Sequence, residues 1–412
     1  MLNKFIALGL FLGLAVGLGA AATGHPWLQA IARESAPLGK LFINAIKMVV
    51  IPLVVTVIFA SIARLGNPRK LGKIGGMTLG FYWVTLIPAI VIGMAVTAFG
   101  VRFAPKIETA NVEAISVPKL QGITDFLVSL VPSNPFAAAS NGAILPLIVF
   151  TALFAAAAGT LAKERRERMV AAAEDISDAL IKLVWWILYT APIGIFGLVA
   201  PATALLGWSL VQSLGVFIVC VFVGLLILVV CVFLPLLFFV AKVRPSVFLK
   251  GIAGAMSIAF STTSTAAAIP VSLEESTKNL GISETVADLI IPLGASMYRP
   301  GSALFQGCAI VFLAHIYGVP VTLATASAVV LATFLVSLTV APVPSSSVVT
   351  MAPALDAIGV PLSGLAFILG IDRIPDMMRS MVNLLGQIST AAIVDRQVTP
   401  EDAVEANALP PV

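Results

Sequence analysis

A row of charged and polar residues lies in an otherwise apolar segment near the C-terminus. It consists of Asp372, Asp376, Arg379, Asn383 and Gln387. Their spacing of i, i+4, i+7, i+11 and i+15 places them on one face of an α-helix. On such a face an arginine can hold a carboxylate bidentately, an aspartate can pair with an ammonium group, and an asparagine can donate and accept. The row suits an amino acid with an acidic side chain, and a structural ladder of ion pairs is the alternative interpretation.

Another charged group interrupts an apolar segment that runs from Val286 to Ile316. Arg299 stands near its middle, followed by Pro300 and Gly301. An arginine at the centre of a membrane helix costs roughly 2.5–3.5 kcal/mol or more on insertion scales. The apolar sequence on both sides is too long for the side chain to reach an interface. We therefore expect Arg299 to have a carboxylate partner inside the protein.

Two further segments are broken by hydroxyl residues and prolines. The first contains STTST at 261–265, followed by Pro270, and the second reads APVPSSS at 341–347. In the first segment, the hydroxyl and backbone N–H groups can bind a carboxylate, or the hydroxyls can donate to carbonyl groups of their own helix. The second segment can be a hairpin tip or a loop in solvent. Breaks at membrane depth need a cover of protein or a water-filled cavity, and paired broken segments point to a transporter's binding site. We predict two re-entrant hairpins whose tips enter from opposite sides.

The composition explains which solvent surrounds these segments. Of 412 residues, 59% are hydrophobic and 11% are charged, and the mean hydropathy is +1.06, whereas soluble domains carry about 25% charged residues. The chain is therefore expected to be an all-α membrane protein in a lipid bilayer. The net charge of +4 without a dense basic tract argues against nucleic-acid binding. Cys220, Cys231 and Cys308 lack metal-ligand or disulfide spacing, so we expect neither a metal nor a cofactor.

Six long apolar runs precede the broken segments, and basic residues gather after every second run. This asymmetry predicts a multi-pass protein with a cytoplasmic N-terminus and an external loop at 102–120. The first run has features of a signal peptide, but its length favours a retained helix. The runs lie near 3–21, 41–64, 75–101, 122–160, 176–206 and 209–242.

Other classes of protein fit these features less well. A channel would need a continuous polar pore, whereas this polar row is short. An enzyme within the membrane would need a nucleophile with a base, or metal ligands. The two histidines, His25 and His315, lie in a loop and near the end of a span, without a neighbouring Glu or Cys pattern. We therefore expect no enzymatic activity.

Several motifs resemble the glutamate transporter family, the dicarboxylate/amino acid:cation symporters, over nearly the whole chain. The segments 46–53, 131–136 and 191–196 look like the second, fourth and fifth helices of that family, and 370–383 matches its eighth. The resemblance implies eight transmembrane helices, two re-entrant hairpins and inverted repeats. It also implies a homotrimer whose transport domains move like elevators past a central scaffold, in a prokaryotic inner (plasma) membrane, with both termini cytoplasmic.

The resemblance also implies a division of the chain into scaffold and transport segments. The expected segments are scaffold helices one and two at 1–74, helix three and an external loop at 75–121, scaffold helices four and five at 122–208, helix six at 209–250, the first hairpin at 251–283, helix seven at 284–318 with a break at 298–302, the second hairpin at 319–360, helix eight at 361–395 and a cytoplasmic tail at 396–412.

Position by position, the resemblance assigns a binding site for an acidic amino acid. Arg379 would take the side-chain carboxylate, Asp376 the amino group, and Asn383 with the first hairpin tip the α-carboxylate. Arg379 argues against members that carry neutral amino acids, and Asp376 against members that carry only dicarboxylates. The implied substrate-binding residues are Ser264, Thr265, Ser302, Val343, Pro344, Asp376, Arg379, Ser380 and Asn383.

The chain departs from the family at the cation sites. The family's seventh helix carries Asn-Met-Asp-Gly-Thr, where this chain has Tyr-Arg-Pro-Gly-Ser at 298–302. The two sodium-ligating aspartates are replaced by Pro300 and Gln387, and the glycine-rich second hairpin reads Pro-Ser-Ser-Ser at 344–347. Tyr82 and Thr85, near a third sodium site, are the residues that remain.

These departures change the expected coupling ion. A hard cation prefers oxygen ligands and negative charge, but two carboxylates are lost and one guanidinium is gained. We expect Arg299 to stand in for sodium beside Asp372 and Asp376, so that transport is independent of sodium. Protons carried on Asp372 or Asp376 are the expected coupling ion, because burial changes the pKa of a carboxylate. Sodium-coupled transport of aspartate, glutamate or a C4-dicarboxylate, and facilitated transport, remain alternatives.

Overall fold

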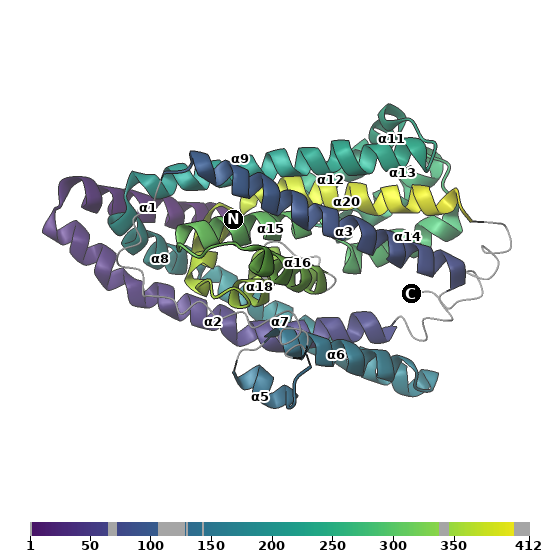
Figure 1. Ribbon diagram of the computed structural model, residues 1–412, viewed down its shortest axis with the longest axis horizontal. Coiled ribbons are helices and arrows are strands. Elements are labelled where there is room, and N and C mark those ends of the chain that lie inside the picture. The colour runs from purple at the N-terminus through teal and green to yellow at the C-terminus, as the bar shows by residue number, and fades with distance from the viewer. Residues whose placement is uncertain are drawn as a thin grey trace.

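The computed structural model describes residues 2–64, 72–105, 128, 131–141, 144–337 and 346–398. These residues form helices joined by short connections, without strands (Figure 1). In chain order the elements are α1 (Leu2–Thr23), α2 (Pro26–Arg64), α3 (Gly72–Gly100), the 3₁₀ turn η2 (Val101–Phe103), α5 (Pro135–Ser140), α6 (Ile144–Gly159), α7 (Lys163–Tyr189), α8 (Ala191–Leu206), α9 (Trp208–Leu228), the π-helical turn η3 (Val229–Phe233), α10 (Leu234–Phe239), α11 (Pro245–Gly251), α12 (Ala253–Thr262), α13 (Thr265–Lys278), α14 (Glu284–Met297), α15 (Pro300–Ile316), α16 (Leu323–Ser337), α17 (Ser346–Thr350), α18 (Ala352–Asp356), the 3₁₀ turn η4 (Leu362–Gly364), α19 (Leu365–Ile371) and α20 (Arg373–Asp395).

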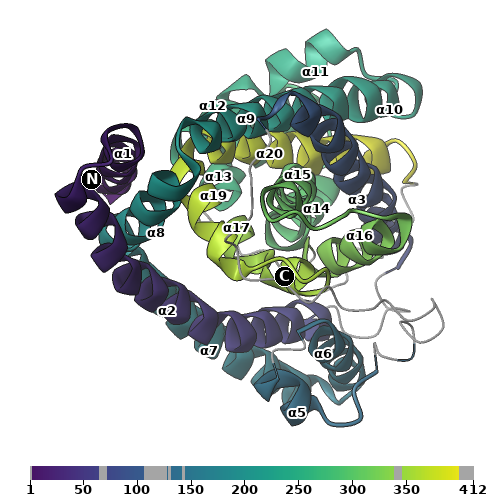
Figure 2. The same ribbon diagram turned by 60° about the vertical axis from the view of Figure 1, so that its left-hand side comes forward.

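The helices fall into a curved arm and a compact body (Figure 2). In the arm, α2 packs against α6, α7 and α8, while α1 packs against α8. Small residues allow this close packing: a Cβ atom added to Gly197 of α8 would lie 2.6 Å from the carbonyl oxygen of Ser35 in α2. The arm therefore has an extensive helix interface of its own, apart from its contacts with the body.

Helix α15 forms the centre of the body. It packs against α3, α9, α16 and α20, and every residue of this helix except His315 is buried. Its sequence is apolar on all sides apart from a few polar positions, which is typical of a helix without a solvent face. Phe217 of α9 lies against Phe305 and Phe312 of α15, with ring centroids 5.8 and 4.9 Å apart. This central helix provides the surface on which the polar side chains of α20 are positioned.

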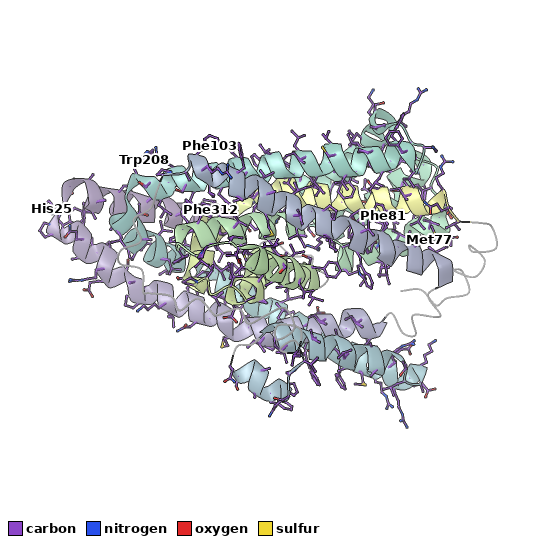
Figure 3. The ribbon with its side chains drawn as sticks, in the orientation of Figure 1. His25, Met77, Phe81, Phe103, Trp208 and Phe312 are labelled. Carbon is purple, nitrogen blue, oxygen red and sulfur yellow. The ribbon has the colours of Figure 1, made fainter. Side chains whose placement is uncertain are left out.

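The outer surface carries large apolar side chains. Phe103 and Trp208 are 72% and 59% exposed and project from the outer edge of the helices (Figure 3). Among the described residues, the helical segments Ile74–Phe103 and Trp208–Phe239 are long and apolar enough to cross a bilayer. Exposed apolar side chains and long apolar helices are typical of a lipid-facing surface.

The apolar run at 176–206 is not the single span that its length predicted. Helix α7 starts upstream in a charged stretch at Lys163 and ends at Tyr189, and α8 begins at Ala191. The second residue of α8 is Pro192, which has no N–H group to continue the ladder of α7. The length of the apolar run therefore did not reveal the boundary between α7 and α8, which Pro192 sets.

The described residues show two of the three predicted breaks, and the one in the segment from Val286 to Ile316 is shorter than expected. Helix α14 ends at Met297 and α15 begins at Pro300, so only Tyr298 and Arg299 leave the helix. Helices α12 and α13 pack together across a two-residue connection. Its first residue, Thr263, has a left-handed backbone with φ of +54°. The stretch 338–345, which includes the predicted site residues Val343 and Pro344, lies outside the described residues.

Candidate functional site

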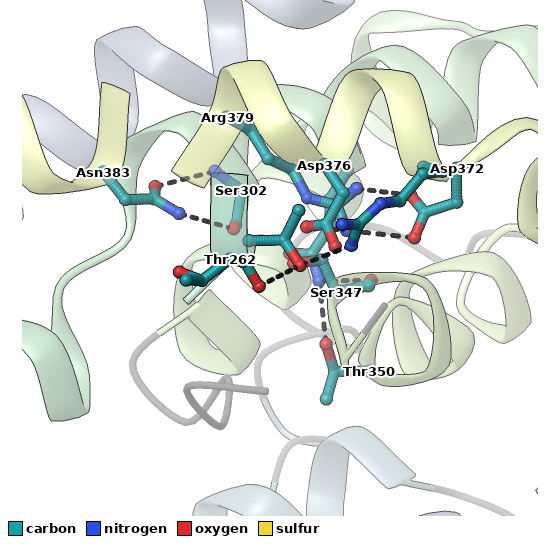
Figure 4. Close-up of polar contacts among 11 residues, drawn as sticks. Thr262, Ser302, Ser347, Thr350, Asp372, Asp376, Arg379 and Asn383 are labelled. Carbon is teal, nitrogen blue, oxygen red and sulfur yellow. Dashed lines mark hydrogen bonds and ion pairs between the residues drawn. The ribbon is translucent and has the colours of Figure 1, made fainter. Parts of the chain in front are cut away.

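Helix α20 turns its polar row toward the interior of the body. Each of the five residues predicted to form the row is at most 4% exposed, whereas Ile374 on the opposite face is 56% exposed. The spacing therefore has the expected consequence: one face of the helix is polar and buried. Figure 4 shows four members of the row along α20, namely Asn383, Arg379, Asp376 and Asp372.

Arg379 is the central charged group of this site. Its Nη1 donates to Asp372 Oδ1 at 2.7 Å and its Nη2 to Asp372 Oδ2 at 3.2 Å. The same Nη2 lies 2.8 Å from Asp376 Oδ1. The face of Phe305 covers the guanidinium, with Cζ 4.2 Å from the ring centroid. Two carboxylates of the chain thus hold the arginine fork, while its Nε has no hydrogen-bond partner among the described residues.

Asn383 joins α20 to the start of α15. Its Nδ2 donates to Ser302 Oγ at 3.0 Å, and its Oδ1 accepts from the backbone N–H of Ser302 at 3.1 Å. The first N–H groups of a helix lack partners within the helix, so Asn383 acts as a cap supplied by another helix. Ser380, another predicted site residue, is buried beside Arg379 on α20.

The close approach of α15 to α20 depends on Gly301. A Cβ atom at this position would lie 2.7 Å from the carbonyl oxygen of Arg379 and 3.1 Å from Asn383 Oδ1. We expect Gly301→Ala to lower the free energy of unfolding by about 1–3 kcal/mol, because backbone must move to admit the methyl group. Thermal unfolding of the purified protein measures this. Gly76→Ala on α3 is the matched control, because a Cβ there meets no atom within 4 Å; equal melting temperatures for the two variants would contradict the close approach.

The hydrogen bonds of Arg299 go to neutral groups of two helices. This residue is 5% exposed, and its Nη2 donates to Thr265 Oγ1 at 3.2 Å and to the carbonyl oxygen of Ala295 at 3.1 Å. Asp376, one of the carboxylates expected beside Arg299, lies close enough to attract its guanidinium electrostatically. The carbonyl end of α14, which carries partial negative charge, adds a second favourable interaction.

The hydroxyl cluster of the first broken segment divides into two uses. Ser261 and Thr262 donate to the carbonyl oxygen of Ile258 in their own helix, as the alternative interpretation held. Thr263 Oγ1 instead accepts from Arg373 Nη1 at 2.8 Å, in the same way as Thr265 accepts from Arg299. Ser264, the other predicted hairpin-tip residue, caps α13 by accepting from the backbone N–H of Ala267 at 3.3 Å. Two arginines from different parts of the chain therefore hold this tip.

Two residues near the site, Phe305, which covers Arg379, and Gln306, were not predicted from the sequence. Gln306 is fully buried, and its Nε2 donates to the carbonyl oxygen of Ser347 and to Thr350 Oγ1, both at 3.0 Å (Figure 4). Its Oε1 accepts from Ser337 Oγ at 3.3 Å. A single glutamine in an apolar helix, four residues after Ser302, was the available signal. Gln306 thus connects α15 to both α16 and α17.

The chain matches the model of the sodium:dicarboxylate symporter family over residues 2–397. It belongs to this family. The resemblance that the motifs suggested is therefore confirmed, and the match extends over both the arm and the body. Sodium:dicarboxylate symporters are membrane transporters, which is the class that the buried charges and the apolar surface indicated.

Relatives in this symporter family cover nearly the full chain. The chain is 32% identical over 402 residues to a proton/sodium-glutamate symport protein of Bacillus subtilis (strain 168), spanning 95% of this chain and 91% of the relative. It is 28% identical over 407 residues to a proton/glutamate-aspartate symporter of Escherichia coli (strain K12), spanning 94% and 91%. A C4-dicarboxylate transport protein of Bacillus subtilis (strain 168) is 29% identical over 375 residues, spanning 88% and 87%.

Proposed function

We propose that this protein is a secondary transporter that carries aspartate or glutamate across the inner membrane. The observation that carries the proposal is the buried guanidinium of Arg379, placed between Asp372 and Asp376 on the same helix face as Asn383. An acidic amino acid has two carboxylates and one ammonium group, and this face offers complementary groups for all three. Relatives with glutamate and aspartate in their names support the assignment.

Substrate binding on this face is an exchange of ion pairs. In the structure Arg379 Nη2 is shared by Asp372 and Asp376. A substrate carboxylate that takes over this donor releases Asp376, which then pairs with the substrate ammonium group. Asp372 keeps its bond to Nη1 and holds the fork in place. The buried arginine is therefore compensated both before and after the exchange, as a buried charge must be.

The α-carboxylate of the substrate is assigned to the polar groups around the start of α15. Asn383 and Ser302 face one another there, and Ser380 lies beside Arg379. The tip at Ser264 and Thr265 is assigned to the same site, and the family resemblance adds Val343 and Pro344, which lie outside the described residues. Helix-start N–H groups and hydroxyls are good anion donors, which supports this assignment.

The transport step is proposed to be an elevator movement in a homotrimer. The arm of α1, α2, α6, α7 and α8 would form the fixed scaffold, and the body would move with its substrate. The close helix packing within the arm and the nearly complete burial of α15 within the body support this division. Eight spans, two re-entrant hairpins, inverted repeats and cytoplasmic termini belong to the same proposal.

Transport of a C4-dicarboxylate is the second candidate function. The relative from Bacillus subtilis named for C4-dicarboxylates supports it, and Arg379 can bind any carboxylate. Asp376 opposes it, because succinate has no ammonium group to compensate the released aspartate. Protons on Asp372 or Asp376 are the proposed coupling ion in either case.

Uptake of radiolabelled aspartate, glutamate and succinate into proteoliposomes tests the proposal, with a pH gradient or a sodium gradient imposed. We expect uptake of aspartate or glutamate driven by the pH gradient, and weaker uptake of succinate. Asp376→Asn should reduce uptake of the amino acids about tenfold or more, through loss of one charge-assisted pair, while succinate uptake falls less. Saturable uptake of succinate alone would overturn the choice of substrate.

A further inference from the structure

The carbonyl end of helix α14 is a candidate site for sodium, the cation in the family's description. The last carbonyl groups of a helix have no partners within it, and they carry the negative end of the helix dipole. In transporters with broken helices, unwound carbonyls and half-helix C-termini coordinate Na⁺. Helix α14 ends at Met297 in a buried break, so its carbonyl end meets this description.

Side chains of the protein already donate to these carbonyls. Gln387 Nε2 donates to the carbonyl oxygens of Gly294 and Tyr298, at 3.1 and 3.0 Å. Arg299 Nη2 donates to that of Ala295 at 3.1 Å. One amide and one guanidinium thus supply three hydrogen bonds at the place where an ion would need oxygen ligands.

The space around this helix end is also filled. Tyr82 donates to the carbonyl oxygen of Ile290 at 3.1 Å, and its ring stacks on that of Tyr298 with centroids 4.0 Å apart. The Tyr298 hydroxyl is hydrogen-bonded to Thr85. A Cβ atom on Gly294 would lie 2.8 Å from both Gln387 Cγ and Tyr82 Oη. Tyrosine rings therefore occupy the volume beside the carbonyls.

The charge at this helix end disfavours a cation as well. Arg299 brings a full positive charge to hydrogen-bond distance of Ala295 O. The described residues contain no cluster of three or more His, Cys, Asp or Glu side chains that could hold a metal ion. A site for a hard cation needs several oxygen ligands with negative charge, so the residues present do not fit sodium.

We infer that the carbonyl end of α14 is permanently closed by the chain's own donors, and that Gln387, together with Arg299, makes substrate binding independent of sodium. The amide nitrogen of Gln387 bridges two carbonyls as an ion would, without leaving or entering during the transport cycle. The consequence for transport rests on the proposed function. The absence of a sodium site at α14 rests on the contacts alone.

Calorimetric titration of aspartate and glutamate into the purified protein, in sodium chloride and in choline chloride, tests the dependence on sodium. We expect equal affinities in the two salts, and equal melting temperatures of the substrate-free protein in the two salts. A rise in affinity of about tenfold or more with sodium, the range of a typical coupling between two ligands, would overturn the inference. So would a sodium-dependent rise in melting temperature.

The paired variant Gln387→Asp, Arg299→Met places a carboxylate beside the freed carbonyls and removes the guanidinium. We expect its melting temperature or substrate affinity to rise with sodium. The control variant Gln387→Asn, Arg299→Met should have the same melting temperature and affinity in both salts. A variant that folds without any response to sodium counts against the inference. If neither amino acid binds the wild-type protein in either salt, the proposed substrate fails, and the melting temperatures still decide whether sodium binds.

Discussion

Arg379→Lys is expected to lower Vmax/KM for aspartate and glutamate by about a hundredfold or more, since each hydrogen bond to a charged group contributes about 1.5–3 kcal/mol. Lysine keeps the charge but has no planar fork. It cannot hold both oxygens of Asp372 and also reach Asp376, as Nη1 and Nη2 of Arg379 do. It also loses the flat contact with Phe305. Initial rates of uptake into proteoliposomes measure the effect.

Lysine is the more informative replacement because alanine would leave the buried carboxylates of Asp372 and Asp376 without their cationic partner. Removing one partner of a buried ion pair costs about 3–5 kcal/mol, so an alanine variant can lose activity merely by unfolding. Arg168→Lys, on an exposed position of α7, serves as the control for the same chemical change. Wild-type kinetics in Arg379→Lys, with Arg168→Lys also unchanged, would show that the fork does not bind substrate.

Gln306→Leu is expected to raise KM about tenfold and to lower the melting temperature. The replacement leaves the carbonyl of Ser347 and the hydroxyls of Ser337 and Thr350 without their glutamine partner, and each unsatisfied buried group costs about 1–3 kcal/mol. These groups belong to α16 and α17, which meet α15 one residue beyond Phe305. Weaker packing of α16 and α17 against α15 is therefore expected to disturb Phe305, the ring that covers Arg379, and so to weaken substrate binding.

Hydrogen exchange distinguishes this effect from a general loss of stability. We expect faster amide exchange in α16 and α17 of Gln306→Leu, with little change in α2 and α8, because exchange reports local opening. Thr333→Val is the matched control: the Thr333 hydroxyl is also buried in α16 but has no hydrogen-bond partner among the described residues. A uniform increase in amide exchange rates across Gln306→Leu would contradict a specific effect on α16 and α17.

The polar row of α20 could be predicted because its signal is local. A spacing of three and four residues in an apolar segment is enough to place Asp376, Arg379 and Asn383 on one buried face. The break before α15 was similarly predictable, since Arg299 and Pro300 both oppose a continuous membrane helix. Family motifs then supplied the expected spans and roles, which the spacing alone does not give.

Features that depend on tertiary approach were not predictable. A carboxylate was expected beside Arg299 on grounds of charge, but the hydrogen bonds of its guanidinium to the end of α14 and to Thr265 of α13 were not foreseen. No spacing in the sequence shows that these elements meet. Gln306 was missed for the same reason, since one glutamine creates no period. The boundary between α7 and α8 was missed because hydropathy does not register the missing N–H group of Pro192.

The balance of buried charges determines how the carrier responds to membrane voltage. Among the described residues, the buried charged side chains are Arg299, Arg379, Asp372 and Asp376, so the charges that the protein itself contributes to the site cancel. Binding an acidic amino acid, with net charge −1 at neutral pH, gives the loaded body one negative charge. An inside-negative potential opposes its inward passage by about 2.3 kcal/mol per 100 mV. Entry with one proton is then electrically silent, and a second proton lets the resting potential itself pull the substrate inward.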